Sequence, residues 1–116
     1  MSDCLFCKIV RKQIPAEVVH EDEQVLAFKD ISPRAPVHIL LIPKAHCSGL
    51  NELTPDVQAA VPRLMEVAAR LARELGVAES GWRLLSNCGA DGGQAVFHLH
   101  FHLLGGRPLG GMVGRG

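Results

Sequence analysis

The sequence predicts one α+β domain with a five-stranded, mostly antiparallel sheet, one long helix and a short N-terminal helix. Three observations lead to this prediction. Five short β-prone runs are separated by turn-forming residues, and one longer segment has apolar residues at helical spacing. A chain of 116 residues also suits a single compact domain better than two. We therefore expect one domain over residues 1–116.

The N-terminal part is predicted to form a short helix over residues 4–11. Asp3 is expected to cap this helix, and Ile14-Pro15 is expected to end it, because the residue before a proline disfavours the helical conformation. The runs at residues 18–20 and 24–28 flank a short acidic turn. This arrangement predicts a β-hairpin.

The centre of the sheet is predicted from the next segments. Two prolines in residues 30–36 exclude regular strand pairing there, so this segment is expected to be a loop. Residues 37–42 are apolar almost throughout, which indicates a central strand. The last two strands are expected near residues 82–87 and 96–104, with a glycine-rich turn at residues 87–93 between them.

The long helix is predicted to begin at Thr54-Pro55 and to stop at Gly76. Pro62 lies inside this segment, where it removes a backbone donor and clashes with the preceding turn, so we expect a kink or a later helix start there. Apolar residues recur every three or four positions and should pack on the sheet. They are Val57, Ala60, Val61, Leu64, Val67, Ala68, Leu71 and Leu75.

The charge pattern narrows the classes of partner. Lysines plus arginines number 12 and aspartates plus glutamates number 12, and no segment concentrates positive charge. This balance does not indicate binding to a nucleic acid polymer or to an anionic membrane surface. The sequence shows neither a signal-peptide pattern nor an apolar run long enough for a membrane span, so we expect a soluble cytoplasmic protein.

Three histidines at alternate positions dominate the C-terminal part of the chain. In an extended strand His98, His100 and His102 share one face, while the apolar residues at 97, 99, 101 and 103 are expected to enter the core. Such a row can supply a nucleophile and hydrogen-bond donors, or it can bind zinc or iron. A third possibility is a set of core histidines with no chemical role. Residue chemistry alone leaves these alternatives open.

The segment before the row favours contact with an oxyanion. Gly92-Gly93-Gln94 combines flexible backbone with a side-chain amide directly upstream of His98. A glycine pair of this kind is also typical of a plain strand connection.

Several sequence matches in the right order resemble the histidine triad (HIT) family, in particular its nucleotide-binding, adenosine phosphoramidase-like branch of bacterial type. The run from His98 to Leu104 alternates histidines and apolar residues as that family does. Asp91-Gly92-Gly93-Gln94 precedes this run, and Gly105-Gly106-Arg107-Pro108 follows it. The segment from Phe28 to His38, together with Ile42-Pro43-Lys44, is also similar to the family.

The resemblance implies an enzyme that hydrolyses purine nucleoside phosphoramidates and releases a nucleoside monophosphate. His100 would be the nucleophile and would form a nucleotidyl-histidine, with the carbonyl of His98 holding its Nδ1 proton and His38 supporting it from behind. His102 would bind phosphate oxygens. The implied nucleotide-binding residues are Asp30 for the ribose, Asn87, Gly93 and Gln94 for the phosphate, and Leu5, Phe6, Ile9, Phe28 and Ile31 for the base.

Other functions remain in view. Within the family, dinucleoside polyphosphate hydrolysis is the nearest alternative, and a non-catalytic nucleotide-binding regulator or a metal-dependent hydrolase built on the triad are further ones. The position after Gln94, often a serine in eukaryotic members, is Ala95 here, which affects how the leaving group is protonated. The resemblance also implies a homodimer.

A zinc site is predicted near the N-terminus. Cys4 and Cys7 have the spacing of half a tetrahedral zinc site, and His46 and His98 are the natural remaining ligands. Many bacterial relatives that have this cysteine pair resemble zinc proteins that use these four positions. Such a site would be structural rather than catalytic, and two reduced cysteines without metal are the alternative. His20 is expected at the surface.

Overall fold

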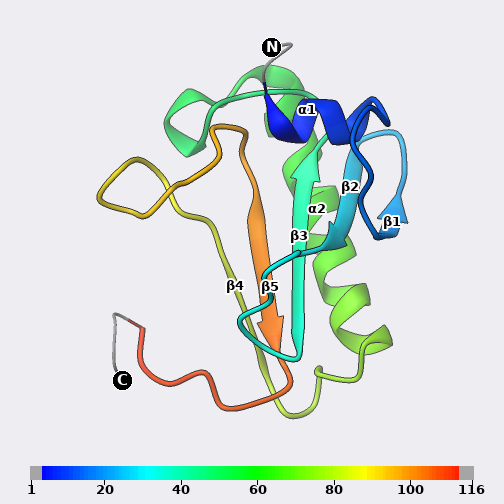
Figure 1. The fold of residues 1–116 in the computed structure, drawn as a ribbon, viewed down its shortest axis with the longest axis vertical. Coiled ribbons are helices and arrows are strands. Elements are labelled where there is room, and N and C mark those ends of the chain that lie inside the picture. Colours follow the sequence, from blue (N-terminus) through cyan, green and yellow to red (C-terminus); the bar gives the residue numbers. More distant parts are fainter. Residues whose placement is uncertain (1–3, 113–116) are drawn as a thin grey trace.

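The computed structural model describes residues 4–112 and contains one five-stranded antiparallel sheet within that range. The strands lie in the order β1-β2-β3-β5-β4, so β1 and β4 form the two edges (Figure 1). The elements are α1 (Leu5–Val10), β1 (Val18–Glu21), β2 (Val25–Lys29), β3 (Val37–Pro43), a 3-10 turn at Leu50–Glu52, α2 (Pro55–Glu74), β4 (Trp82–Leu85) and β5 (Phe101–Gly105).

The two helices cover opposite faces of the sheet. Helix α2 lies behind the sheet in Figure 1, whereas α1 crosses the upper part of the front face. The α2 side forms the main core, in which Ile39, Leu41 and Leu103 of the sheet pack with Leu64 and Leu71 of the helix. Because α1 is only six residues long, it leaves the lower part of the front face open for a cavity.

Helix α1 is capped by Cys4. The Cys4 Sγ accepts a hydrogen bond from the backbone N–H of Cys7 at 3.4 Å. The expected cap, Asp3, lies outside the described residues. Phe6 and Ile9 face the sheet and pack with apolar residues of β2 and β3.

Helix α2 begins as predicted at Pro55, with Thr54 as its N-cap. It continues through Pro62 as one helix, so the alternative of a later start is wrong. The carbonyl that loses its partner to Pro62 belongs to Gln58, which is exposed, so water can satisfy it. No helix within residues 4–112 is long and apolar enough to cross a membrane.

Strand β5 begins at Phe101, five residues later than predicted. The pairing of β3 with β5 starts at Leu41 and Phe101, and upstream the Leu99 N–H instead donates to the Cys47 carbonyl at 2.8 Å. The chain before β5 therefore pairs with the segment that follows β3 rather than with β3 itself. Phe97, expected in the core, is 56% exposed, so this expectation is wrong.

His20 is not a surface residue, because its side chain is only 8% exposed. His20 belongs to β1 and its side chain reaches α2: its Nε2 donates to Asp22 at 2.7 Å, and its Nδ1 accepts a hydrogen bond from Arg70. Asp22 also accepts from Arg63 of α2 at 2.9 Å, and these contacts hold the pKa of its carboxyl well below the usual range. The hairpin is thus fixed to α2 by a polar network.

Candidate active site

A cavity of about 440 Å³ opens on the face of the sheet opposite α2. Its lining residues include residues of α1, of the loop between β2 and β3 and of the segment before β5. Eleven of the twelve residues expected to bind or transform a nucleotide line it. They are Leu5, Phe6, Ile9, Phe28, Asp30, Ile31, His38, Asn87, Gly93, His100 and His102.

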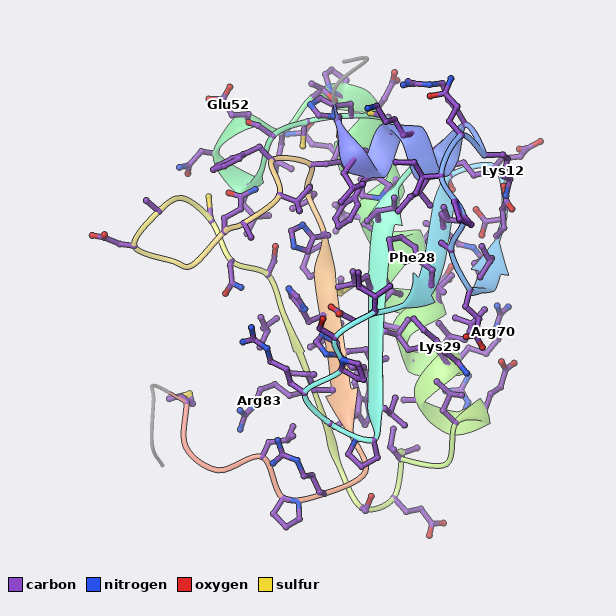
Figure 2. The ribbon with its side chains drawn as sticks, in the orientation of Figure 1. Lys12, Phe28, Lys29, Glu52, Arg70 and Arg83 are labelled. Carbon is purple, nitrogen blue, oxygen red and sulfur yellow. The ribbon has the colours of Figure 1, made fainter. Side chains whose placement is uncertain are left out.

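The upper end of the cavity is apolar. Phe6 of α1 and Phe28 of β2 meet edge to face, with ring centroids 5.6 Å apart (Figure 2 labels Phe28). Phe6 also approaches His100 edge to face at 5.1 Å. Leu5 is 43% exposed and Ile31 is 97% exposed, so these two side chains form the rim rather than the floor. A flat apolar group fits this end of the cavity.

His100 presents an unprotonated ring nitrogen. Its Nδ1 lies 2.8 Å from the carbonyl oxygen of His98, and because a carbonyl only accepts, Nδ1 carries the proton. Nε2 therefore keeps its lone pair, and it has no hydrogen-bond partner among residues 4–112. The hydroxyl of Ser86 donates to the carbonyl of His100 at 2.7 Å and holds the backbone in place.

His102 presents the opposite kind of nitrogen. The backbone N–H of Arg34 donates to Nδ1 of His38 at 3.1 Å, so the His38 proton is on Nε2. That Nε2–H donates to Nδ1 of His102 at 2.9 Å. The His102 proton is consequently on Nε2, and His102 offers an N–H donor beside the lone pair of His100.

His38 thus contacts His102, not His100 as expected. In the sheet, residues two apart along a strand share a face, and β3 pairs His38 with Leu104 and Leu40 with His102. His38 and His102 therefore lie diagonally across adjacent strands on the cavity face. His100 precedes β5, which begins at Phe101, so it is not paired with a residue of β3.

Burial keeps both members of this histidine pair neutral. Desolvation, together with the nearby His100 and His38 rings, lowers the pKa of His102 to about 4. Desolvation also lowers the pKa of His38, although Asp30 opposes that shift. At neutral pH the pair is a chain of neutral donors and acceptors, not a pair of cations.

Asp30 lies on the wall of the cavity with its side chain 18% exposed. One carboxylate oxygen accepts the backbone N–H of Ser32 at 2.7 Å, and the other lies 3.4 Å from Nε2 of His38. A carboxylate has about four acceptor sites, so Asp30 can accept further hydrogen bonds from a ligand.

Gln94 is the one expected nucleotide-binding residue that the cavity lining lacks. Its Nε2 donates to the carbonyls of Ser48 and Val96 at 2.6 and 3.0 Å, and its Oε1 accepts from the N–H of Gly89 at 2.9 Å. Both amide protons are therefore used within the protein. Gln94 here fixes the glycine-rich loop and does not point a donor into the cavity.

A second cluster of side chains lies beside the cavity, at the start of α1. Cys4, Cys7, His46 and His98 place their ligand atoms within 4.8 Å of one another. The Sγ atoms of Cys4 and Cys7 lie 3.4 and 3.6 Å from Nδ1 of His98. The Nδ1 atoms of His46 and His98 are 3.1 Å apart. Cys7 Sγ lies 3.4 Å from Nδ1 of His46.

These distances fit the edges of a zinc tetrahedron. Zinc–ligand bonds of about 2.3 Å to sulfur and about 2.1 Å to nitrogen place sulfur and nitrogen about 3.6 Å apart and two nitrogens about 3.4 Å apart. His98 Nε2 donates to the carbonyl of Pro43 at 2.9 Å, which leaves Nδ1 free to bind a metal. Burial also lowers the pKa of His98 to about 4, so its ring is neutral.

A further cluster, Asp30 with His38 and His102, also has the residue types of a metal site. A cation on Nε2 of His38 would move the proton of that ring to Nδ1, where the N–H of Arg34 already points. Two donors would then face each other. The hydrogen bonds therefore assign this cluster to the orientation of His102 rather than to metal binding.

Sequence reasoning missed some residues that shape the site. Leu40 and Leu104 line the cavity, and the two-residue period from His38 and His102 was a signal that could have found them. The N–H of Arg34 left no signal, because every non-proline residue carries the same group.

The low pKa of His102 predicts a loss of stability in acid. The unfolded chain binds a proton near pH 6.5, whereas the folded chain binds it only near pH 4, so folding is weakened as the pH falls through this window. The contribution is on the order of 2–3 kcal/mol. In urea unfolding at pH 7, 5.5 and 4.5, His102→Gln should show a flatter pH dependence than the wild type.

Glutamine suits this test because its side-chain oxygen can accept the proton of His38. The exposed α2 variant Gln58→Ala is the control and should keep the wild-type slope. Equal slopes for wild type and His102→Gln would show that His102 is not protonated differently in the folded and unfolded chain.

The cavity brings a histidine lone pair, a neutral N–H donor, a carboxylate and an apolar pocket together, which suits nucleophilic attack on phosphorus. The family model described as "HIT domain" matches residues 11–109. A purine nucleoside phosphoramidase of Escherichia coli (strain K12) is 47% identical over 111 residues, which cover 96% of this chain and 93% of that protein.

Solved structures of HIT family proteins are also similar to this chain. A HIT family hydrolase from Clostridium thermocellum has a TM-score of 0.91 and 44% identity, and the match covers 97% of this chain and 98% of that chain. A Zn-bound histidine triad family protein from Mycobacterium smegmatis has a TM-score of 0.78 and 36% identity, and it covers 91% of this chain and 76% of that chain. The chain belongs to the histidine triad (HIT) family.

Proposed function

We propose that this protein hydrolyses purine nucleoside phosphoramidates at the α-phosphorus and releases a nucleoside monophosphate. The observation that carries the proposal is the pair of complementary nitrogens in one cavity: Nε2 of His100 with a lone pair and Nε2 of His102 with a proton. The E. coli relative named purine nucleoside phosphoramidase supports this substrate class.

In the first step, Nε2 of His100 attacks the α-phosphorus and forms a P–N bond while the bond to the leaving amine breaks. His100 needs no base, because its nucleophilic nitrogen is already unprotonated. The Nε2–H of His102 donates to a non-bridging phosphate oxygen. Charge on these oxygens grows in the transition state, so a fixed donor stabilises the transition state more than the ground state.

In the second step, water attacks phosphorus and the P–N bond to His100 breaks. One proton of the water leaves to solvent, the hydroxyl becomes part of the nucleoside monophosphate, and His100 returns to its neutral tautomer. The carbonyl of His98 stabilises the histidine throughout, because it accepts the Nδ1 proton in the free and the nucleotidylated ring alike.

The rest of the cavity binds the nucleoside in this proposal. The purine lies at the apolar end between Phe6 and Phe28, and Asp30 accepts the ribose hydroxyls. Ala95 lines the cavity where a hydroxyl would serve the leaving side. The leaving amine then takes its proton from water, so the rate should fall for amines that are poor proton acceptors.

A covalent intermediate is the direct test. Wild-type protein and His100→Asn are mixed with adenosine 5′-phosphoramidate, quenched in acid within milliseconds to seconds and weighed by mass spectrometry, while released AMP is assayed in parallel. We expect a nucleotide-mass adduct on the wild type alone and a loss of turnover in the variant of at least about 10³-fold.

Two outcomes would contradict the proposal. Tight AMP binding by the wild type, with neither adduct nor turnover, would indicate a nucleotide-binding regulator. Turnover that survives in His100→Asn would place the nucleophile elsewhere. Parallel assays with a dinucleoside polyphosphate show which substrate class has the higher kcat/KM.

We further propose that Cys4, Cys7, His46 and His98 bind one structural zinc ion. The ligand distances support this, as does the Zn-bound family member from Mycobacterium smegmatis. Four protein ligands would complete the tetrahedron, so the ion would have no open position for substrate. Zinc binding needs reduced thiolates, so we also propose the reducing cytoplasm as the location.

Removal of a ligand tests the zinc site. We expect about one zinc per chain in wild type purified without added metal, and less than about 0.1 in Cys4→Ser and Cys7→Ser, because three ligands bind zinc far more weakly than four. Cys88→Ser is the matched control, since Cys88 lies outside the cluster and should leave the zinc content unchanged. Metal analysis by mass spectrometry gives the ratio, and equal zinc in all variants would overturn the site.

We propose that two chains, each one domain over residues 1–116, form a homodimer. Strand β4 is a sheet edge, and an unpaired edge is a ready surface for another strand. Phe97 is an aromatic side chain left 56% exposed. Light scattering should give a mass of twice 12.5 kDa, and a mass of 12.5 kDa at micromolar concentration would contradict this part.

A further inference from the structure

The segment after β5 contacts the loop before β3 through one arginine. Arg107 Nη2 donates to the carbonyl oxygen of Arg34 at 2.6 Å, and its Nη1 donates to the carbonyl of Pro108 at 2.8 Å. The second bond fixes the guanidinium group, so the first has a defined direction. Gly106 brings the two segments close: its φ is 96°, and a Cβ there would lie 2.8 Å from the Cβ of Pro36.

The residue that Arg107 holds is also the residue that orients His38. The N–H of Arg34 donates to Nδ1 of His38 at 3.1 Å, and Nε2–H of His38 donates to Nδ1 of His102 at 2.9 Å. Hydrogen bonds at the carbonyl and at the N–H of Arg34, which are joined through its Cα, therefore link the guanidinium of Arg107 to His38 and on to the ring of His102. This series ends at Nε2–H of His102, the proposed phosphate donor.

Within residues 4–112, few other hydrogen bonds hold the middle of this loop. Its ends are joined by the N–H of Asp30, which donates to the carbonyl of His38 at 3.0 Å, and its start is closed by the Asp30 side chain on Ser32. Residues 31–34 are exposed, and only Ala35 is buried. The Arg107 contact thus comes from outside the loop and acts where the loop itself supplies few restraints.

We propose that Arg107 is a positioning residue that keeps His102 in the tautomer with a proton on Nε2. This inference rests on the proposed function, in which that proton binds phosphate. Without Arg107 the amide of Arg34 moves freely, and Nδ1 of His38 can take a proton from water. The proton on Nε2 of His38 then moves to Nδ1 of His102, and Nε2 of His102 releases its own proton to water. Net charge is unchanged, but a lone pair then faces the phosphate.

The chain offers a matched control. Arg83 extends from β4 to the same C-terminal segment, where its Nη2 donates to the carbonyl of Gly110 at 2.8 Å (Figure 2). Arg83→Ala therefore removes the same charge and a similar bond to the segment, but no contact with the loop. Arg107→Lys keeps one donor for the Arg34 carbonyl and loses the bond to Pro108.

The test records the ¹⁵N resonances of the histidine rings in zinc-loaded wild type, Arg107→Ala, Arg107→Lys and Arg83→Ala, without nucleotide. Protonated and unprotonated ring nitrogens resonate at well separated positions, so the tautomer is read directly. We expect His102 to carry its proton on Nε2 in the wild type and in Arg83→Ala. Arg107→Ala should give a mixture of tautomers, and Arg107→Lys should lie between.

Kinetics give a second readout. Arg107→Ala should lower kcat for the phosphoramidate about five- to tenfold, the effect of one hydrogen bond, while KM changes less than about twofold. A wild-type tautomer in Arg107→Ala, or an equal mixture in Arg83→Ala, would overturn the proposal. Because the NMR experiment needs no turnover, a wild type without phosphoramidase activity would contradict the proposed function and leave the tautomers to decide the role of Arg107.

Discussion

The hydrogen bond from Nδ1 of His100 to the carbonyl of His98 is the constraint on which the site depends. His98 makes contacts through both its side chain and its backbone. Its ring lies in the Cys/His cluster, where Nε2 donates to the carbonyl of Pro43, and its own carbonyl orients His100. A shift of His98 would release the ring of His100 and let its lone pair turn away from the cavity. The cluster and the proposed nucleophile are therefore linked through His98, although none of the four cluster residues lines the cavity.

The two cavity histidines are complementary because backbone groups set their tautomers in opposite senses. The carbonyl of His98 accepts from His100. The N–H of Arg34 donates to His38, which in turn donates to His102. Neutral imidazoles carry one donor and one acceptor each, so fixing one nitrogen determines the other. Burial supports this arrangement by lowering the pKa of His102 to about 4. An imidazolium at His102 would direct its Nδ1–H at the Nε2–H of His38, so two donors would meet.

The sequence was most informative where a pattern is local. Helical spacing and the Thr54-Pro55 start predicted α2. The alternation of histidines predicted one shared face, and in the structure His100 and His102 line the cavity whereas His98 does not. The sequence was less informative where a group forms a hydrogen bond with the backbone of a residue that is distant in sequence. The start of β5 depends on the carbonyl of Cys47, the ring nitrogen of His102 depends on an amide 68 positions away, and the amide of Gln94 is taken by Ser48. These partners are backbone N–H and C=O groups, which nearly every residue carries, so the sequence does not mark them.

Helix α1 shows why the cluster and the cavity form one structural unit. Six residues are too few for a helix that is stable alone, so α1 must be held by its contacts. Cys4 caps the helix and, with Cys7, brings it to His98, while the Phe6 ring lies 6.0 Å from the ring of His98 and 5.1 Å from that of His100. Any ion bound by the cysteines would therefore stabilise the wall that covers the apolar end of the cavity. The same short helix would couple metal binding to the shape of the nucleotide pocket without placing the metal near the reacting atoms.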